Sequence, residues 1–251
     1  MSHNNEDRTL AYQLISFVFI GMLLVFFASV LVTRSIYKKI ILDTQLDNMR
    51  HLAHERVYLL DGIMANVEAL GRVSLDLMSN PQIISSTLEE HLKNVLLDNP
   101  TVHSICYVQD PEDGGRPQML NTIRNSFIKR EISGKDFLYY DWYQIPTISG
   151  KAGWIEPWFD GEGKGVLMVS YAMPMYQSGE ITGVLRFDIE LAYLQELLIH
   201  NASFRVGNSF LVSSTGTLIS YQDPNLVMHQ TLFSLAQEYD DPDLAVWDMP
   251  W

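Results

Sequence analysis

Two aromatic stretches hold the side chains best suited to binding a ligand. They are Phe137-Leu-Tyr-Tyr-Asp-Trp-Tyr-Gln-Ile-Pro146 and Gly153-Trp-Ile-Glu-Pro-Trp-Phe-Asp160. Aromatic faces interspersed with the carboxylates of Asp141, Glu156 and Asp160 suit a small molecule, and an organic cation in particular, because both kinds of group attract positive charge. The alternative for any single ring is a place in the core of a small domain. For the cluster as a whole, the sequence favours a binding site.

No residue spacing in the chain predicts catalysis or a metal site. Asp160-Gly-Glu-Gly-Lys-Gly165 is rich in glycine but lacks the GxxxxGK[ST] order of a phosphate-binding loop. His51 and His54 lie one helical turn apart, which a solvated helix face explains better than a metal site. Cys106 is the single cysteine, so it forms no internal disulfide, and we expect it to be buried. We therefore expect no catalytic residue, no metal and no cofactor.

The net charge of the chain limits the classes of molecule that it can bind. Over 251 residues the formal net charge is −13 at pH 7. A chain this acidic is a poor partner for nucleic acid or for an anionic membrane surface. Acidity could also favour a cationic ligand, although it more often reflects solubility alone.

An uncharged apolar run from Ala11 to Val32 predicts a transmembrane helix. At ~1.5 Å per residue the run covers the ~30 Å hydrocarbon layer of a bilayer, and it is apolar on every face. It is longer than the ~7–15-residue core of a signal peptide, so we expect an uncleaved anchor. Residues 1–10 are then a cytoplasmic tail and residues 11–33 the span.

The charges that flank this run argue for the opposite sidedness. Arg8 precedes the run, whereas Arg34, Lys38 and Lys39 follow it. The positive-inside rule would place the residues after the run in the cytoplasm. We nevertheless expect them to lie outside, in the periplasm or at the cell exterior, for the reason given with the family resemblance below.

Residues 34–80 are predicted to continue the anchor as a long stalk helix, which ends at Asn80-Pro81. Apolar residues recur there at spacings of three and four, close to a heptad seam. These are Met49, Ala53, Val57, Leu60, Met64 and Val67. The stripe must pack either on a second copy, which would make the chain a homodimer, or on a domain of the same chain.

The rest of the chain alternates between helix and strand patterns. Helical spacing at 83–97 is followed by strand patterns at 102–108, 166–172 and 181–189, and by helical spacing at 190–199. A second hairpin at 210–212 and 217–220 then precedes a short helix at 231–239. This order predicts an α+β fold with an antiparallel sheet.

Four segments, in this order and spacing, resemble the membrane-distal module of double Cache sensor domains. They are Asp141-Trp-Tyr-Gln-Ile-Pro146, Trp154-Ile-Glu-Pro-Trp-Phe-Asp160, Val166-Leu-Met-Val-Ser-Tyr-Ala-Met-Pro174 and Gly183-Val-Leu-Arg-Phe-Asp-Ile189. Phe210-Leu-Val-Ser-Ser-Thr-Gly-Thr-Leu-Ile-Ser220 resembles the start of the membrane-proximal module. The resemblance implies two PAS-like sheet modules, at 81–200 and, incompletely, at 201–251. It also implies an extracytoplasmic location at the cell inner membrane.

The resemblance further implies a ligand pocket in the distal module. In amino-acid-binding members, an Arg two residues before the Trp holds the ligand carboxylate, and aromatics and an Asp hold the amine. The predicted ligand-binding residues are Tyr140, Trp142, Tyr143, Trp158, Asp160, Tyr171 and Asp188. Tyr140 stands at the Arg position, so the carboxylate clamp is absent, which favours an amine or another small solute. Arg186 shares a strand face with Asp188 and is equally consistent with a structural pair or a ligand contact.

These expectations describe an extracytoplasmic small-molecule sensor, the input domain of a bacterial transmembrane signalling protein. Binding would be passed through the stalk to an output that this sequence does not contain. Two alternatives stay open. The chain could be the N-terminal part of a membrane-bound signalling enzyme, such as a histidine kinase, serine phosphatase or cyclic-dinucleotide enzyme, or it could be a structural anchor without a ligand. The chain is then either a fragment or the product of a truncated gene.

Overall fold

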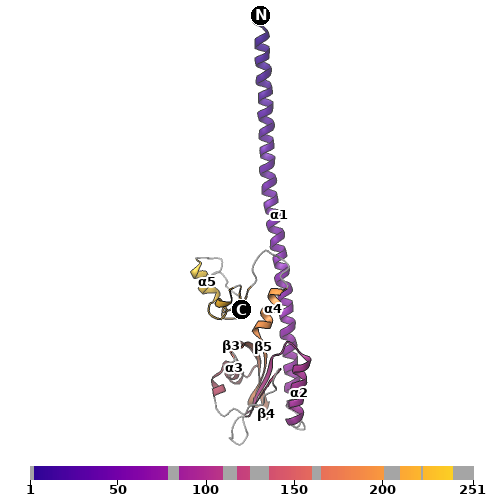
Figure 1. The fold of residues 1–251 in the computed structure, drawn as a ribbon, viewed down its shortest axis with the longest axis vertical. Coiled ribbons are helices and arrows are strands. Elements are labelled where there is room, and N and C mark those ends of the chain that lie inside the picture. Colours follow the sequence, from indigo (N-terminus) through magenta and orange to yellow (C-terminus); the bar gives the residue numbers. More distant parts are fainter. Residues whose placement is uncertain are drawn as a thin grey trace. The chain divides into compact units, whose positions relative to one another are not determined.

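The computed structural model describes residues 3–78, 85–109, 118–124, 136–159, 165–200, 210–221 and 223–239. The chain divides into two compact units, residues 1–55 and 56–251. A single helix, α1 (His3–Met78), belongs to both (Figure 1). The predicted anchor and stalk are therefore continuous helix.

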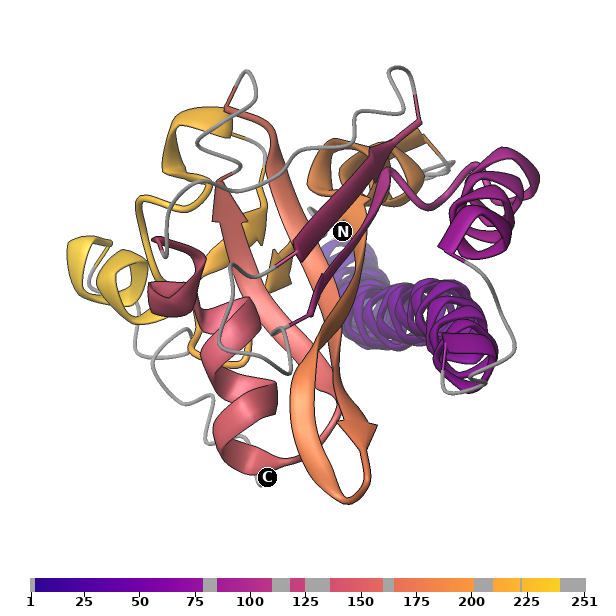
Figure 2. The same cartoon turned by 90° about the horizontal axis from the view of Figure 1, so that it is seen from below.

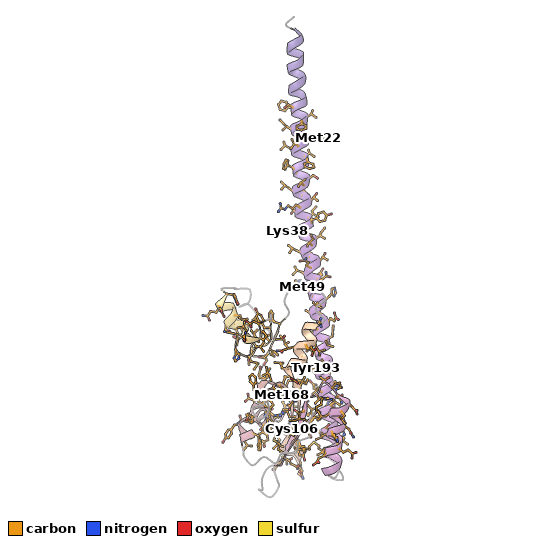
Figure 3. The ribbon with its side chains drawn as sticks, viewed as in Figure 1. Met22, Lys38, Met49, Cys106, Met168 and Tyr193 are labelled. Carbon is orange, nitrogen blue, oxygen red and sulfur yellow. The ribbon has the colours of Figure 1, made fainter. Side chains whose placement is uncertain are left out.

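The first unit consists of the N-terminal part of α1. From residue 16 to residue 50 its described apolar side chains are exposed, with Phe17 76% and Met22 73% exposed (Figure 3). The helix is long and apolar enough to cross a membrane, and none of its most apolar stretch is buried. An apolar helix without protein cover is what a lipid-facing segment requires.

The second unit is built around a five-stranded antiparallel sheet. Its strands are β1 (Ser104–Gln109), β2 (Gln118–Ile123), β3 (Gly153–Phe159), β4 (Leu167–Gln177) and β5 (Glu180–Glu190). They lie in the order β2-β1-β5-β4-β3. The predicted hairpin of β4 and β5 turns at Ser178 and Gly179, both with positive φ. The expected α+β sheet module is confirmed, although β2 and β3 were not predicted as strands.

Helices cover both faces of this sheet (Figure 2). The C-terminal part of α1 and α2 (Ser85–Asp98) lie on one face, and α3 (Asp141–Ser149), preceded by the short 3-10 helix η1 (Asp136–Tyr139), lies on the other. Helix α4 (Leu191–His200) follows β5, as the sequence predicts. Helix α3 was not predicted, because Pro146 and the aromatic run obscure its helical pattern.

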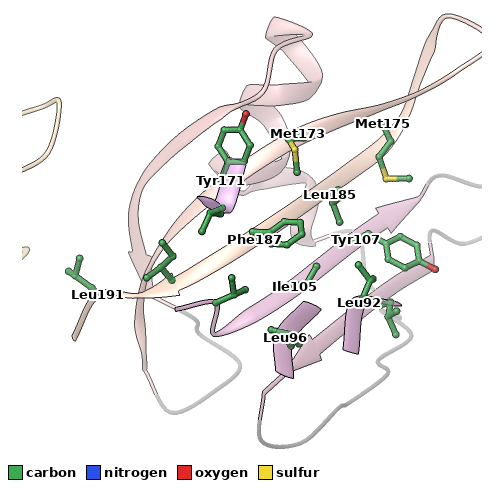
Figure 4. Packing of buried hydrophobic residues seen from close by; sticks show 14 of the residues in the cluster. Leu92, Leu96, Ile105, Tyr107, Tyr171, Met173, Met175, Leu185, Phe187 and Leu191 are labelled. Atoms are coloured by element: carbon green, nitrogen blue, oxygen red, sulfur yellow. The ribbon is translucent and has the colours of Figure 1, made fainter. Parts of the chain in front are cut away.

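The larger core lies between the sheet and α1 and α2. Phe187, Leu185, Ile105 and Leu92 are fully buried there (Figure 4). Side chains at alternate positions of β4 and β5 point into this core, and the remaining positions point toward α3. The two faces of the sheet therefore differ. The face toward α1 and α2 carries the larger apolar core, and the face toward α3 carries the polar residues considered below.

Helix α1 contributes its own stripe to that core. Val67 is fully buried, and Leu60 and Leu70 pack against the same cluster. By contrast, Met49 and Val57 of the predicted heptad seam are 39% and 51% exposed. Packing within the chain therefore explains the C-terminal part of the stripe, from Leu60 to Val67. The homodimer stays a prediction.

The remaining described elements lie beyond residue 210. They are β6 (Leu211–Val212), β7 (Leu218–Ser220), the 3-10 helix η2 (Pro224–Leu226) and α5 (Leu232–Glu238). The hairpin of β6 and β7 and the short helix match the predicted elements. The Thr231 and Ser234 side chains cap the start of α5 reciprocally. The predicted domain boundaries, with modules at 81–200 and 201–251, stay a prediction.

Candidate ligand-binding site

Helix α3 brings an aromatic layer onto the sheet. It begins at Asp141, whose carboxylate suits the positive end of the helix dipole, and it ends at Gly150, which adopts a left-handed φ of 66°. Trp142, Tyr143 and Pro146 form its buried side. Phe137 of η1 meets the Tyr143 ring edge-on at 5.0 Å between centroids. The aromatic run of the sequence thus folds into a short helix whose rings face β4 and β5.

The polar centre beneath this layer is the pair Arg186 and Asp188 on β5. Arg186 is 3% exposed and Asp188 is completely buried. Arg186 Nη2 donates to Asp188 Oδ2 at 3.0 Å, and Arg186 Nε lies 2.8 Å from Oδ1. The neighbouring strands supply further donors at the positions directly opposite Asp188. These are the hydroxyls of Ser104, at 2.6 Å from Oδ2, and Ser170, at 2.7 Å from Oδ1.

The Arg186 guanidinium lies between two tryptophan rings. Its Cζ is 4.2 Å from the ring centroid of Trp142 and 4.5 Å from that of Trp158. Both distances are within the range of a cation–π contact. The Trp158 ring is fixed in turn, because its Nε1 donates to Ser170 Oγ at 2.7 Å. We call Trp142, Trp158 and Asp188 the cation cage, and Arg186 its occupant.

Strand β3 reaches the cage through an irregularity in its pairing. Ile155 pairs with Ser170 and Trp158 pairs with Met168, so β3 uses one residue more than β4 over this interval. Such a β-bulge reverses which face the later residues occupy. Trp154 consequently packs toward α1, where its Nε1 donates to Glu68 Oε1 at 3.0 Å, while Trp158 packs toward α3.

A cavity of about 180 Å³ opens beside the cage. The residues that line it come from η1, α3 and β3 and the junctions beside them. They are Tyr139, Tyr140, Asp141, Trp142, Ile155, Glu156, Pro157 and Trp158. The Tyr140 ring is stacked with that of Trp142, at 6.3 Å between centroids, and tilted against that of Trp158, at 6.4 Å. Two carboxylates and four aromatic rings therefore surround a volume suited to a small molecule.

The structure brings only part of the predicted site together. Tyr140, Trp142 and Trp158 line the cavity. Tyr143 is buried beneath them, and Asp188 lies behind the Arg186 guanidinium. Asp160 lies outside the described residues.

Tyr171 is placed away from this group. It neighbours Ser170 in β4 and therefore points to the opposite face of the sheet. There Tyr171 lies in the core shared with α1 (Figure 4). Its ring centroid is 5.3 Å from that of Trp154. Burial and the nearby Glu68 carboxylate raise the pKa of the Tyr171 hydroxyl. Ser170, and not Tyr171, lies directly opposite Asp188 and points to the same face of the sheet.

Sequence reasoning also missed Ser104, which completes the Asp188 environment from β1. The signal for both serines is their register opposite a buried carboxylate, which requires the strand pairing to be known. Within the described part of the chain, no group of three or more His, Cys, Asp or Glu side chains is arranged to hold a metal ion.

Comparison with known proteins identifies the class of this module. Residues 88–196 match the family model described as methyl-accepting chemotaxis protein-like, first PDC sensor domain. A segment of 60 residues is 40% identical to the methyl-accepting chemotaxis protein TlpQ of Pseudomonas aeruginosa, covering 24% of this chain and 8% of that relative.

Solved structures support the same fold. The extracellular domain of mmHK1S-Z3, described as a histidine kinase, matches with a TM-score of 0.63 at 23% identity, covering 74% of each chain. The ligand-binding domain of the Campylobacter jejuni chemoreceptor Tlp3, in complex with L-valine, gives 0.57 at 18%, covering 74% of each chain. That of the P. aeruginosa amino acid chemoreceptor PctC, in complex with GABA, gives 0.52 at 24%, covering 72% of this chain and 74% of that one.

The module therefore has the fold of the ligand-sensing input domains of signalling proteins. Within it, residues 88–196 match the PDC, or Cache, sensor domain that stands first in methyl-accepting chemotaxis protein-like chains. This confirms the resemblance recognised in the sequence.

Proposed function

We propose that this chain is the membrane-anchored sensing part of a transmembrane signalling protein, and that its ligand binds in the cavity beside the cation cage. The observation that carries the proposal is the lining of that cavity. It combines the rings of Tyr140, Trp142 and Trp158 with the carboxylates of Asp141 and Glu156. The chain contributes by binding a ligand and not by catalysis.

The chemistry of the lining favours an amine or an uncharged small solute. No Lys or Arg is among the described residues that line the cavity. A ligand carboxylate there would lack a charge-assisted partner worth about 1.5–3 kcal/mol. The solved domains in complex with L-valine and GABA share the fold with this chain. At the position where the family resemblance implies an arginine clamp, this chain has Tyr140.

The anchor is the apolar first part of α1, and the sensor domain lies on the outer side of the inner membrane. The exposed apolar surface of this helix and the extracytoplasmic setting of related domains support this arrangement. The Lys and Arg residues that follow the anchor oppose it, which makes sidedness a necessary experiment.

The route from cavity to anchor runs through β3. Its far end carries Trp158 of the cavity wall, and its near end carries Trp154, hydrogen-bonded to Glu68 of α1. Movement of β3 on binding would thus displace α1. A ligand produces such a shift only if it binds the two arrangements with different affinity.

One observation favours a second candidate. The Arg186 guanidinium already fills the space between Trp142 and Trp158. An aromatic layer filled by a side chain of the same domain is also what a structural module without a ligand would contain. Such a module would serve only as an anchor or assembly element.

A ligand screen separates the two candidates. The full chain in detergent micelles is heated with amines, amino acids, carboxylates and uncharged solutes, and its unfolding temperature is followed by tryptophan fluorescence. We expect amines or uncharged solutes to raise the unfolding temperature, because a ligand that binds the folded state stabilises it. A chain that responds to none of these classes would favour the structural module.

A further inference from the structure

The carboxylate of Asp188 already accepts three hydrogen bonds from side chains of this domain. Ser104 and Arg186 donate to Oδ2, and Ser170 donates to Oδ1, which also faces Arg186 Nε. Asp188 has no exposed surface. A ligand ammonium could reach this carboxylate only by removing one of these partners, and Arg186 is the one that carries the same charge.

The sheet is shaped to hold this guanidinium. On the two strands beside β5, the residues directly opposite Arg186 are Cys106 and Ala172, both small and fully buried. Their short side chains leave room above the strand for the arginine stem and for the two tryptophan rings. Larger side chains at either position would compete for the same space.

We propose that Arg186 is a specificity-determining residue that acts as a tethered ligand of the cation cage. Its guanidinium occupies the place between Trp142, Trp158 and Asp188 that a free organic cation would otherwise take. The wild-type chain therefore excludes free cations from Asp188 and confines ligands to the outer cavity. This inference rests on the proposed function for its meaning in sensing, but the occupied cage can be tested without any signalling ligand.

The charges of Arg186 and Asp188 explain why free cations are excluded from the cage. The buried pair is neutral as it stands, with one guanidinium and one carboxylate. An additional ammonium would place a second positive charge beside Arg186 in a poorly solvated site, which is strongly unfavourable. Loss of the guanidinium reverses the situation, because it leaves a buried carboxylate and two tryptophan rings without a cation.

The direct test is chemical rescue of Arg186→Ala. Ethylguanidinium supplies the atoms that this substitution removes, namely the two terminal carbons of the arginine stem and the guanidinium. We expect ethylguanidinium at millimolar concentration to raise the unfolding temperature of the full-length Arg186→Ala chain and to leave that of the wild type unchanged. Adding Trp158→Ala should weaken the rescue about tenfold, since one ring wall is lost.

Arg124→Ala is the matched control. Arg124 is half-buried, whereas Arg186 is fully buried, and it donates to the backbone carbonyls of Asn99 and Val102 and not to a carboxylate. Ethylguanidinium should not rescue this variant to a comparable extent. Equal rescue of both variants, or an equal response of the wild type, would overturn the proposal.

A second measurement keeps the test decisive if Arg186→Ala does not fold alone. In that case ethylguanidinium should restore folding, and failure to do so at any tolerated concentration counts against the cage. On the folded wild type, the Arg186 Nε–Hε resonance, identified by its loss in Arg186→Lys, should be displaced by the two rings and should exchange slowly with water. It should also stay unchanged when ethylguanidinium is added. A signal that averages with exposed arginines, or that moves with the added cation, would contradict the proposal.

The two proposals can fail separately. If the rescue fails while the wild type still responds to small molecules in the screen, the tethered ligand is wrong and the sensor stands. If the rescue succeeds and no class of small molecule stabilises the wild type, the cage is correct and the module is structural.

Discussion

At the scale of single residues, the chemistry of this domain depends on alternation along β5. Arg186 and Asp188 face α3, whereas Phe187 between them is buried in the opposite core. Period-two alternation thus places a charged pair and a core anchor in three consecutive residues. Two serines on the flanking strands also donate to the carboxylate, whereas the buried Arg186 Nε lies close to Oδ1 but has no hydrogen-bond partner.

Ser170 connects the carboxylate to the tryptophan wall, and its removal should cost stability. Its hydroxyl donates to Asp188 and accepts from Trp158 Nε1. Ser170→Ala leaves both partners short of a hydrogen bond, so we predict a loss of about 1–3 kcal/mol in the free energy of unfolding. Urea denaturation followed by tryptophan fluorescence measures this. The exposed Ser149→Ala should be neutral, and an equal effect of the two would contradict the hydrogen-bond relay.

At the scale of elements, α1 has two glycines with opposite expectations. A Cβ on Gly62 would meet no atom within 4 Å, whereas a Cβ on Gly71 would lie 2.5 Å from Met173 Cε. Gly62→Ala should therefore stabilise by about 0.5–1 kcal/mol through helix propensity. Gly71→Ala should destabilise by about 1–3 kcal/mol, because Met173 is buried and must move. Thermal unfolding of both variants checks the packing of α1 on the sheet. Equal stabilisation by the two substitutions would show that α1 does not pack closely on the sheet at Gly71.

The contact between α1 and α2 should make stability depend on pH. His91 Nε2 lies 3.2 Å from the buried Ser74 Oγ, and burial lowers the pKa of His91 below its usual 6.5. The unfolded chain therefore binds the proton more tightly than the folded chain. The contribution of His91 is present above pH 6.5 and is lost as the pH falls through the lowered pKa.

Unfolding free energies of the wild type and His91→Gln between about pH 8 and about pH 5 test this dependence. We predict that the wild type loses more stability on acidification than His91→Gln does. If the unfolding free energies of the two chains change equally with pH, His91 is not the source of the pH dependence.

Elements with strong local patterns could be predicted from the sequence, and those that depend on tertiary packing could not. The apolar run of α1 and the hairpin of β4 and β5 have clear periodicity. Helix α3 has an internal proline, and only its contact with the sheet stabilises its aromatic run. The bulge in β3 turns Trp158 to the face opposite the one that simple alternation predicts. No residue pattern in the sequence indicated this bulge. The Arg186–Asp188 pair was foreseen as one of two alternatives, but its tryptophan cage required α3 and the bulge together.

At the scale of the whole molecule, the proposed sensing requires the domain that follows the anchor to lie outside the cytoplasm. Related domains are extracytoplasmic, whereas the charges after the anchor favour the cytoplasm. We predict that a phosphatase that is active only outside the cytoplasm will be active when fused after residue 80. A cytoplasmic reporter fused at the same position should be silent. The reverse result would contradict the proposed sidedness.

The central claim is that the aromatic cavity beside the cage holds the ligand, and Tyr140 tests it most directly. Its ring lines the cavity, yet the residue is 46% exposed, so its removal should leave the fold intact. The measurement is the calorimetric affinity of the strongest compound from the screen for wild type, Tyr140→Ala and Ile148→Ala. Ile148 is the control, because it lies on the same helix as Trp142 and is 83% exposed. We predict that Tyr140→Ala weakens binding about tenfold or more and that Ile148→Ala leaves it unchanged. Unaltered affinity in Tyr140→Ala would place the ligand elsewhere and contradict the account.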